Sequence, residues 1–411
     1  MPGIPKHGLR LTRVLRGRVL AELSLVVIVA VLAVFVLIGQ PPAARTTAAV
    51  SPFPYPSPLP SAAPTAEPWN LDADIGSAMI LSWQASTPWP VVRAELMRDQ
   101  IGGVLLFTPN FGGQPSGLKA LADRLQALAS STCLGHPILV MLDEEGGEVA
   151  NVKAAFAPPW PSVMATGGPD HVRALETMNG AGLRAAGVGL NLAPVADVRT
   201  NRQDLVIGAR SFGGDPSKVA PLVGAAVRGL HEGGVGVTLK HFPGLGGAAG
   251  DPHVAIPTDP ETEAHWRQVQ MPSFQAGISA GADAVMTTAV YVPGLGAGSM
   301  PAMFSAPVVG RLRTQLGFTG VIVTDSLSMG GIGARWSLPQ AAVMALAAGN
   351  DFVMLGNGDP SYEASAIAAV RAAVLSDRLS WAKLHASAMR VNALRDRWGG
   401  RMTPCRSGAW A

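Results

Sequence analysis

The stretch GVIVTDSLSM, at residues 320–329, opens with β-branched apolar residues and ends in polar ones. Such a run is typical of a short buried strand that ends at a polar edge of its sheet. Seven similar runs occur along the chain, separated by amphipathic stretches with helical spacing. The predicted strands are 78–83, 103–107, 138–142, 189–192, 236–239, 284–287, 321–324 and 352–355. The clearest helical stretches are 117–129, 216–232, 261–280 and 339–348.

Eight strand–helix units favour an α/β fold, namely a single parallel (β/α)8 barrel of the TIM type over residues 69–398. A doubly wound open sheet is the alternative, although no glycine-rich phosphate-binding pattern accompanies it. Active sites of such barrels lie at the carboxyl ends of the strands. The polar residues that end each run are therefore the candidates for chemistry.

The composition excludes several classes of protein. Of the 411 residues, 48% are hydrophobic and 14% are charged, which is too apolar for a disordered chain. The net charge is only +3, and five of the 31 basic residues lie within residues 1–18. Without these five, 26 basic residues stand against 28 acidic ones, so the body has no basic surface suited to nucleic acid.

The N-terminal sequence predicts a membrane anchor. A basic start at residues 1–18, expected in the cytoplasm, precedes a nearly uncharged stretch at 19–39 that is long enough to cross a bilayer. We expect a single-pass signal-anchor with an extracytoplasmic catalytic domain; a cleaved signal peptide and a secreted body are the alternative. Residues 40–68, rich in Pro, Ala, Ser and Thr, predict an extended linker, and residues 399–411 a short tail.

The chain has two cysteines, Cys133 and Cys405. In an exported protein they can form one disulfide that fixes the C-terminal tail, and two unpaired thiols are the alternative. Neither lies near the residues that carry the predicted chemistry.

Two strand ends carry candidates for catalysis and binding. Asp325 follows the run at 321–324, where a carboxylate can attack an anomeric carbon, as in retaining glycoside hydrolysis. The alternative role of Asp325 is to cap the following helix. Lys240 and His241 follow the strand at 236–239 and are suited to binding sugar hydroxyls, with a structural ion pair and a rim histidine as the alternative.

A glycine-rich loop at 244–250 leads to Asp251, Pro252 and His253. An aspartate two residues from a histidine can orient and polarise the imidazole, which then serves as general acid and base near neutral pH. An ordinary Asp-Pro turn with an exposed histidine is the alternative. A zinc site is disfavoured because the required set of histidine and cysteine ligands is missing.

Three consecutive carboxylates, Asp143, Glu144 and Glu145, follow the strand at 138–142 and precede two glycines. They are suited to holding a sugar diol or a metal ion, and a solvated acidic turn is the alternative. Arg210 is a candidate either for binding ligand hydroxyls or for a structural ion pair.

Together the motifs resemble one family. The sequence KHFPG at 240–244, then six residues, then D-x-H closely resembles the signature of β-N-acetylhexosaminidases in glycoside hydrolase family 3. The resemblance extends over about residues 70–398. The other matching blocks are DEEGG (143–147), NLAPVADV (191–198), RSFGGD (210–215), MPSFQAGISAGADAVMT (271–287), LGFTGVIVTDSLSM (316–329) and ALAAGNDFVML (345–355).

The resemblance implies a retaining exo-β-N-acetylglucosaminidase with a single barrel domain. Asp325 matches the family's nucleophile, and His253, supported by Asp251, matches its acid–base pair. The residues that would hold the terminal N-acetylglucosamine are Asp143, Arg210, Lys240, His241 and Met286. The resemblance implies no metal and no cofactor. For an exported protein, it suggests peptidoglycan fragments or related glycans as substrates.

The sequence departs from the family pattern at five positions. Glu148 and Asn151 stand where arginines are usual, Leu245 and Ala289 where histidines are usual, and Pro252 where the family has serine. These changes remove cations and hydrogen bonds from the pocket rim. Two alternatives to the enzyme therefore stay open: a membrane-tethered, catalytically weak or inactive sugar-binding barrel, and a β-glucosidase-like exo-glycosidase.

Overall fold

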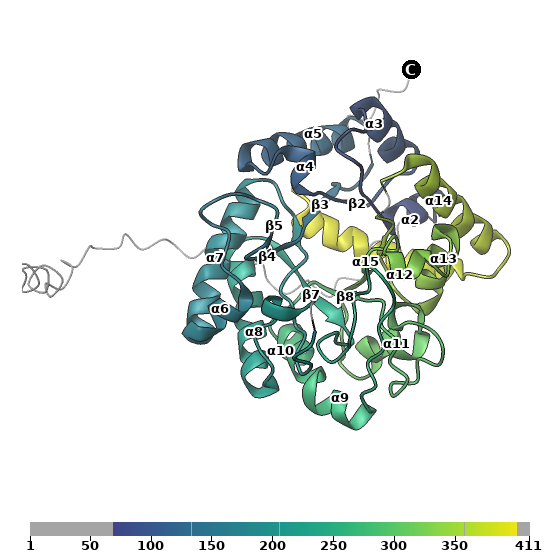
Figure 1. Ribbon diagram of the computed structural model, residues 1–411. Helices are drawn as coiled ribbons and strands as arrows, with labels where there is room; N and C mark the ends of the chain where they lie inside the picture. Colours follow the sequence, from purple (N-terminus) through teal and green to yellow (C-terminus); the bar gives the residue numbers. More distant parts are fainter. Residues whose placement is uncertain (1–68, 133, 205, 357, 401–411) are drawn as a thin grey trace, which may run out of the picture. The chain divides into compact units, whose positions relative to one another are not determined.

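A parallel sheet of eight strands closes into a barrel (Figure 1). The strands are β1 (Met79–Leu81), β2 (Gly103–Leu105), β3 (Leu139–Leu142), β6 (Leu190–Asn191), β7 (Gly236–Phe242), β8 (Ala284–Thr287), β9 (Val321–Thr324) and β10 (Val353–Met354). Their order in the sheet is β10-β1-β2-β3-β6-β7-β8-β9. A parallel bridge between Val323 and Phe352 joins β9 to β10 and completes the circle. The predicted TIM-type barrel is confirmed, and the open sheet is excluded.

The computed structural model describes residues 69–400, apart from residues 133, 205 and 357. The predicted cytoplasmic start, signal-anchor and linker lie outside these residues, as do both cysteines and residues 401–411 of the predicted tail. In the described part of the chain, no helix is both long and apolar enough to span a membrane.

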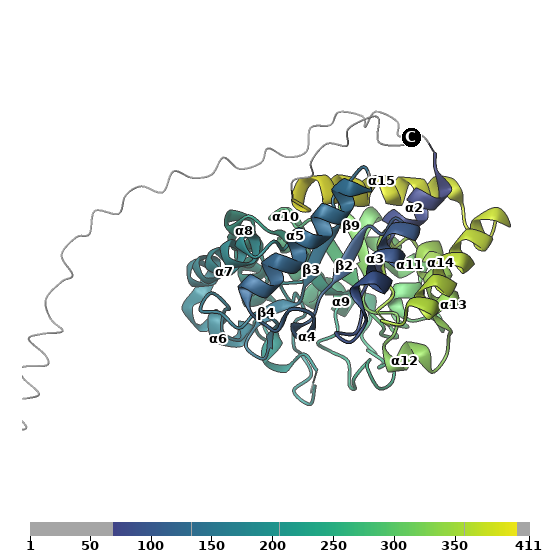
Figure 2. The same ribbon diagram turned by 90° about the horizontal axis from the view of Figure 1, so that it is seen from above.

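Helices connect successive strands and surround the sheet (Figures 1 and 2). The α-helices are α2 (Leu71–Ser77), α3 (Trp89–Arg98), α4 (Thr108–Phe111), α5 (Pro115–Ser131), α6 (Pro161–Met164), α7 (Gly168–Ala185), α8 (Pro216–Gly233), α9 (Glu263–Val269), α10 (Met271–Ser279), α11 (Ala306–Thr314), α12 (Gly330–Gly333), α13 (Leu338–Ala348), α14 (Pro360–Leu375) and α15 (Trp381–Trp398). Short 3-10 helices η1 (Ala165–Gly167), η2 (Gly208–Arg210) and η3 (Ala302–Phe304) and a two-stranded sheet of β4 (Glu144–Gly146) and β5 (Val149–Ala150) complete the elements.

Local chemistry explains where these helices begin and end. For example, the Asp215 side chain accepts a hydrogen bond from the backbone N–H of Ser217 and caps α8. Pro216 occupies the first turn, where its missing N–H costs nothing, and Gly234 ends the helix in the left-handed conformation. The predicted helices at 117–129, 216–232 and 339–348 correspond to α5, α8 and α13.

The prediction of one continuous helix at 261–280 is wrong. The structure has two helices, α9 and α10, which meet at Gln270. Pro272 lies in the first turn of α10 and cannot donate the backbone hydrogen bond that a continuous helix requires. The Gln270 side chain instead binds the backbone N–H and carbonyl of Val198. These two hydrogen bonds of the Gln270 side chain fix the chain that follows β6.

The inside of the barrel is filled with apolar side chains from alternate strand positions, and the last helix covers its N-terminal end. Leu394 and Trp398 of α15 belong to the same buried cluster as these barrel residues. A methyl group at Gly236 would lie 2.8 Å from the Trp398 ring, so glycine allows this close contact. The Trp398 ring N–H also donates to Asp283 at 2.9 Å. The opposite end, formed by the strand carboxyl ends, is left for a site.

One buried carboxyl in the helical layer is set up to keep its proton. Glu176 of α7 is 1% exposed and accepts a hydrogen bond from Asn179 at 3.0 Å. Burial raises the pKa of Glu176 to about 8, although the hydrogen bond from Asn179 opposes this. A carboxyl whose pKa is higher in the folded state favours folding less as pH rises from its ordinary pKa, 4.5, to about 8.

We therefore predict that Glu176→Gln becomes increasingly stabilising, relative to the wild type, as pH rises. The glutamine carbonyl can accept the same hydrogen bond, and it needs no proton to stay neutral. Thermal unfolding at pH 5 and pH 8.5 measures the effect, with a difference of a few degrees expected at the higher pH. Asp170→Asn, at an exposed position of the same helix, is the control and should show no such trend. An equal difference at both pH values would contradict the raised pKa.

Candidate active site

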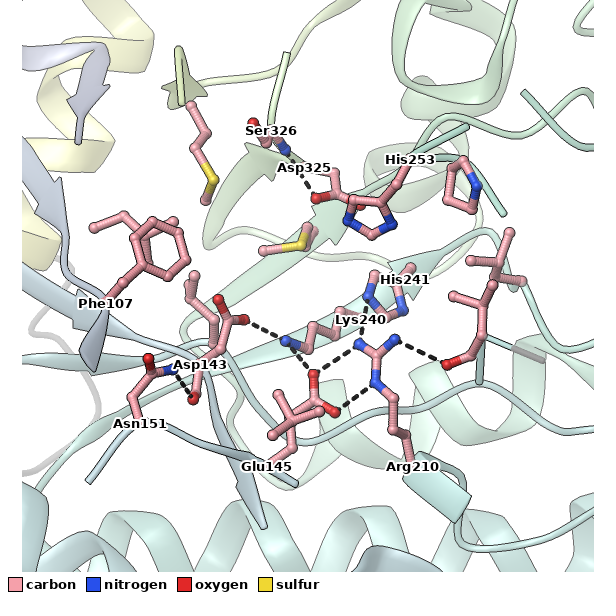
Figure 3. A pocket seen from close by; sticks show the side chains of 18 of the residues that line it. Phe107, Asp143, Glu145, Asn151, Arg210, Lys240, His241, His253, Asp325 and Ser326 are labelled. Atoms are coloured by element: carbon pink, nitrogen blue, oxygen red, sulfur yellow. Dashed lines mark hydrogen bonds and ion pairs between the residues drawn. The ribbon is translucent and has the colours of Figure 1, made fainter. Parts of the chain in front are cut away.

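A cavity of about 450 Å³ lies where the strand carboxyl ends meet (Figure 3). Asp143 follows β3, Lys240 and His241 belong to β7, and Asp325 follows β9. The residues predicted from the sequence that line this cavity are Asp143, Arg210, Lys240, His241, His253, Met286 and Asp325. The remaining predicted residue, Asp251, contacts His253. The fold thus brings together residues that are up to 182 positions apart in the sequence.

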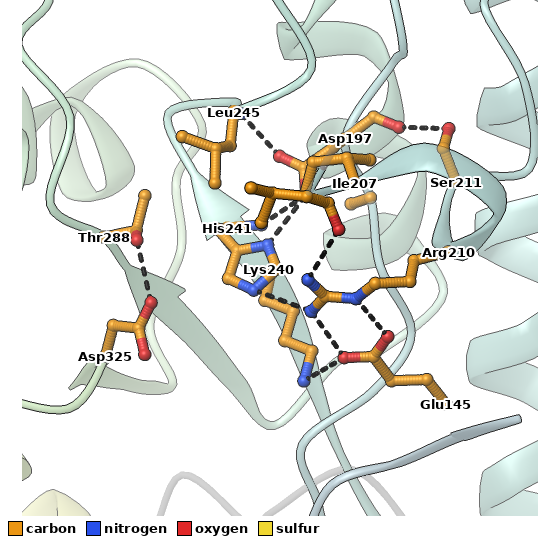
Figure 4. Close-up of polar contacts among 12 residues, drawn as sticks. Glu145, Asp197, Ile207, Arg210, Ser211, Lys240, His241, Leu245, Thr288 and Asp325 are labelled. Carbon is orange, nitrogen blue, oxygen red and sulfur yellow. Dashed lines mark hydrogen bonds and ion pairs between the residues drawn. The ribbon is translucent and has the colours of Figure 1, made fainter. Parts of the chain in front are cut away.

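A buried lysine and a partly buried arginine form a fixed ion-paired cluster at one side of the cavity. Lys240 Nζ lies 2.5 Å from Asp143 Oδ1 and 2.6 Å from Glu145 Oε1. Arg210 binds Glu145 in bidentate fashion, with Nε and Nη2 donating at 2.7 and 2.8 Å (Figure 4). Such geometry is specific to arginine and holds its planar group in one orientation.

This cluster stays charged over a wide pH range. Burial by itself would raise the pKa of Glu145, but Lys240 and Arg210 outweigh it and hold the pKa at about 2. Burial would likewise lower the pKa of Lys240, but Asp143 and Glu145 raise it above its usual range. The cavity therefore presents an array of charged groups whose positions are already fixed. Such groups can bind several hydroxyls of a sugar without reorganising.

Contacts of both ring nitrogens fix the orientation of His241. Its Nδ1 lies 2.8 Å from Asp197 Oδ2, which can only accept a hydrogen bond when ionised, so Nδ1 carries the proton. Its Nε2 lies 3.3 Å from Arg210 Nη2, which can only donate. Asp197 also accepts from the backbone N–H of Leu245 at 2.6 Å and so fixes the chain after β7 (Figure 4).

Asp197 is a site residue that the sequence analysis did not select, and Glu145 was named there only as one of three consecutive carboxylates, without a role of its own. A signal for Glu145 was present, because alternate residues of an extended chain face the same side. Asp143 and Glu145 accordingly both reach Lys240, whereas Glu144 points away and accepts from the backbone N–H groups of Asn151 and Val152 at 2.8 and 3.0 Å. Burial raises the pKa of Glu144 to about 7. The three carboxylates therefore do not form a solvated turn, and they do not all face one ligand: Asp143 and Glu145 bind Lys240, whereas Glu144 binds backbone.

Asp325 is held by two hydrogen bonds. Thr288 Oγ1 donates to Asp325 Oδ2 at 2.8 Å, and the backbone N–H of Ser326 donates to Oδ1 at 2.8 Å. The alternative role as a helix cap does not apply, because the next helix, α12, is preceded by Met329 at its cap position. Asp325 is therefore a positioned, partly exposed carboxylate that lines the cavity.

Asp251 and His253 form a hydrogen-bonded pair. His253 Nδ1 lies 2.8 Å from Asp251 Oδ1, which also accepts from the His253 backbone N–H at 2.9 Å. Partial burial would raise the pKa of Asp251, but its hydrogen bonds with His253 lower it. The ionised carboxylate directs the proton to Nδ1 and leaves Nε2 available for proton transfer. The His253 side chain is 65% exposed, so a ligand can reach it.

The loop that carries this pair contacts the segment that carries Asp325. The backbone N–H of Gly331 in α12 donates to the carbonyl of Pro252 at 3.2 Å. A methyl group at Gly330 would lie only 2.3 Å from the carbonyl oxygen of His253. Because Gly330 has no side chain, the loop with Asp251 and His253 can lie directly against α12.

The departures from the family pattern have different structural consequences. Asn151 accepts from the backbone N–H of Thr108 at 2.9 Å and donates to the carbonyl of Asp143 at 2.8 Å, so it fixes the end of β3. Leu245 and Ala289 are buried and pack in the apolar core. Glu148 is exposed and lines the cavity.

Comparison with known proteins agrees with this fold. The glycosyl hydrolase family 3 N terminal domain matches residues 76–394. A β-hexosaminidase of Stenotrophomonas maltophilia (strain K279a) is 35% identical over 272 residues, which are 64% of this chain and 78% of that protein. A β-hexosaminidase of Methylobacillus flagellatus is 36% identical over 284 residues, 65% of this chain and 79% of that protein.

Two solved structures have the same barrel. The family 3 β-N-acetylglucosaminidase from Paenibacillus sp. str. FPU-7 aligns with a TM-score of 0.77 and 32% identity, covering 83% of this chain and 65% of that chain. The β-N-acetylhexosaminidase from Beutenbergia cavernae aligns with a TM-score of 0.73 and 32% identity, covering 80% of this chain and 99% of that chain. The barrel fold, the family match and the similar enzymes together show that the protein is a glycoside hydrolase. The chain belongs to glycosyl hydrolase family 3.

We predict that Gly330→Ala lowers kcat/KM for an aryl β-N-acetylglucosaminide roughly 10- to 100-fold, because the added methyl group displaces the backbone of His253 beside the cavity and small displacements within a site are costly. Gly333→Ala is the matched control: it lies in the same short helix, and a methyl group there meets no atom within 4 Å. Steady-state kinetics and thermal unfolding of both variants make the test. Equal activity of the two variants would show that the contact does not position His253.

Proposed function

We propose that the protein is a retaining exo-β-N-acetylglucosaminidase in which Asp325 is the nucleophile and His253, supported by Asp251, is the acid–base group. The observation that carries this proposal is that Asp325 and the available nitrogen of His253 belong to two segments in contact with each other, beside one cavity. Two of the relatives are a β-hexosaminidase and a β-N-acetylglucosaminidase, which supports the same reaction class.

In the first step of the proposed mechanism, an Asp325 oxygen attacks C1 of the terminal sugar. The bond from C1 to the leaving oxygen breaks, and His253 Nε2 gives its proton to that oxygen. The Asp251 carboxylate stabilises the imidazolium before this transfer. In the second step, neutral His253 takes a proton from water, the water oxygen attacks C1, and Asp325 leaves. Two inversions give net retention of the β configuration.

The proposed sugar-binding residues are Asp143, Arg210, Lys240, His241 and Met286. The ion pairs leave N–H groups of Lys240 and carboxylate oxygens of Asp143 beside the cavity, where they can bind hydroxyl groups. Met286 adds an apolar, polarisable surface against which the C–H groups of a ring can pack. This combination is typical of a site that fixes one sugar by a few polar contacts.

The natural substrates that we propose are extracytoplasmic glycans with a terminal β-N-acetylglucosamine, including peptidoglycan fragments. This part of the proposal depends on the signal-anchor predicted at residues 19–39, with a secreted body as the alternative. The inactive sugar-binding barrel and the β-glucosidase are alternatives that the kinetic tests separate.

We predict that Asp325→Asn lowers kcat for an aryl β-N-acetylglucosaminide by about 10³-fold or more, since a neutral amide is a poor nucleophile. Proton NMR of the wild-type reaction should show the β anomer of N-acetylglucosamine as the first product. Asp215→Asn, at the exposed helix cap, is the control and should keep its activity. A wild-type protein that binds N-acetylglucosamine without turnover would favour the sugar-binding alternative, and a preference for the aryl glucoside would favour the glucosidase.

We also predict that the effect of His253→Ala depends on the leaving group. With an unactivated sugar leaving group, loss of the general acid should lower kcat/KM about 10²- to 10⁴-fold, whereas with 2,4-dinitrophenolate the first step should be nearly unaffected. Added azide should restore the second step and yield the β-glycosyl azide. Val254→Ala changes the neighbouring exposed residue and is the matched control. The same loss with both leaving groups would contradict the assignment of His253 as the acid.

A further inference from the structure

The segment that follows β8 places a hydroxyl group against the proposed nucleophile. Thr288, the first residue after β8, is fully buried, and its Oγ1 donates to Asp325 Oδ2 at 2.8 Å (Figure 4). An ionised carboxylate can only accept, so the hydroxyl is the donor. The backbone N–H of Asp325 also donates to the carbonyl of Thr287 at 2.7 Å. Two hydrogen bonds therefore join the end of β8 to the residue that follows β9.

The Thr288 hydroxyl is presented from a fixed backbone. The backbone N–H of Thr288 donates to the carbonyl of Phe242, at the end of β7, at 3.1 Å, and its carbonyl accepts from the N–H of Met303 in η3 at 3.2 Å. Asn350 connects the same parts, because it donates to the carbonyl of Met303 at 2.8 Å and accepts from the hydroxyl of Thr287 at 2.7 Å. A β-branched side chain is also stiff at its first torsion angle, which limits the directions that the hydroxyl can take.

Asp325 has few other partners. Among the described residues no lysine, arginine or histidine forms an ion pair with it, and its second hydrogen bond comes from the backbone N–H of Ser326 at 2.8 Å. The cations that line the cavity, Lys240 and Arg210, are bound to other carboxylates. Thr288 is therefore the one side chain in the described part of the chain that hydrogen-bonds the nucleophile. A hydrogen bond to an ionised oxygen is roughly twice as strong as one to a neutral oxygen, so its strength follows the charge on Asp325.

We propose that Thr288 is a positioning residue that assists the second step of the reaction, in which Asp325 leaves the sugar, rather than the first step. Thr288 is buried and is not among the residues that line the cavity, so it acts through Asp325 and not on the sugar. The inference rests on the proposed function, because it requires the covalent intermediate.

The charge on Asp325 explains why the two steps differ. In the intermediate, Asp325 is an ester without net charge. In the second step the oxygen of water forms a bond to C1, the bond from C1 to the Asp325 oxygen breaks, and its electron pair returns to the carboxylate, while the water proton goes to His253 Nε2. The Thr288 hydroxyl stabilises this returning charge. In the first step the same charge is consumed, so the hydrogen bond holds Asp325 in place but does not favour its attack.

Stopped-flow kinetics of the full-length protein with 2,4-dinitrophenyl β-N-acetylglucosaminide test the proposal. With this leaving group the first step appears as a burst of dinitrophenolate and the second as the steady rate. Thr288→Val replaces the hydroxyl by a methyl group of similar size. We expect the second-step rate constant to fall about tenfold and the first-step rate constant to stay unchanged or rise slightly. Mass spectrometry of the intact variant should accordingly show a larger share of glycosyl-enzyme during turnover.

Three further variants keep the test decisive. Thr288→Ser keeps the hydroxyl and should restore most of the second-step rate, whereas Thr288→Ala lacks it and should repeat the selective loss even if Thr288→Val is unstable. Thr287→Val is the matched control, because it removes a buried hydroxyl from the adjacent residue that bonds Asn350 and not Asp325. It should lower the temperature of unfolding and leave the ratio of the two rate constants unchanged.

An equal loss in both rate constants, or a loss in the first alone, would overturn the proposal, since the hydroxyl would then only hold the structure of the site. Failure of Thr288→Ser to restore the second step would overturn it as well. The proposed function fails in a different way: the wild type then releases no dinitrophenolate, or Asp325→Asn releases it as fast as the wild type, and the role of Thr288 fails with it.

Discussion

The contact of Lys240 with Asp143 and Glu145 is the interaction on which the rest of the site depends. A buried ammonium group is tolerated only where opposite charges surround it, so β7 and the end of β3 must occupy their native positions together. Arg210 attaches η2 to the same carboxylate, and its Nη2 lies close to His241. One shared ion cluster thus orients side chains from three separate segments before a ligand arrives.

The sequence predicted the fold because each strand end has the same pattern, an apolar run followed by polar residues. It also predicted which residues would line the cavity, since parallel strands bring their carboxyl ends to one side. It did not predict the break at Gln270. Pro272, in the first turn of α10, was a signal for that break, whereas the contact of the Gln270 side chain with Val198 is not visible in the sequence. The inward orientation of Glu145 depends on strand phase, and the role of Asp197 on a contact with His241; neither is visible in residue type alone.

Two of the residues that depart from the family pattern, Asn151 and Leu245, make hydrogen bonds that hold the backbone around the cavity. Asn151 replaces a long cation by a short amide that ties Thr108 to the end of β3, so the same position stabilises the frame of the cavity. Leu245 is buried, and its backbone N–H is bound by Asp197. Glu148, by contrast, changes the charge that an approaching ligand meets.

The position of α15 has a consequence for how the chain acquires its structure. This helix covers the N-terminal end of the barrel and packs against α2, so the last described helix contacts the first. During synthesis, the inner apolar residues of the early strands stay exposed until the final segment emerges. Because β1 also pairs with β10, closure of the sheet waits for the same stretch. The barrel is therefore expected to form late and as a whole, after the apolar faces of the early strands have stayed uncovered for most of synthesis.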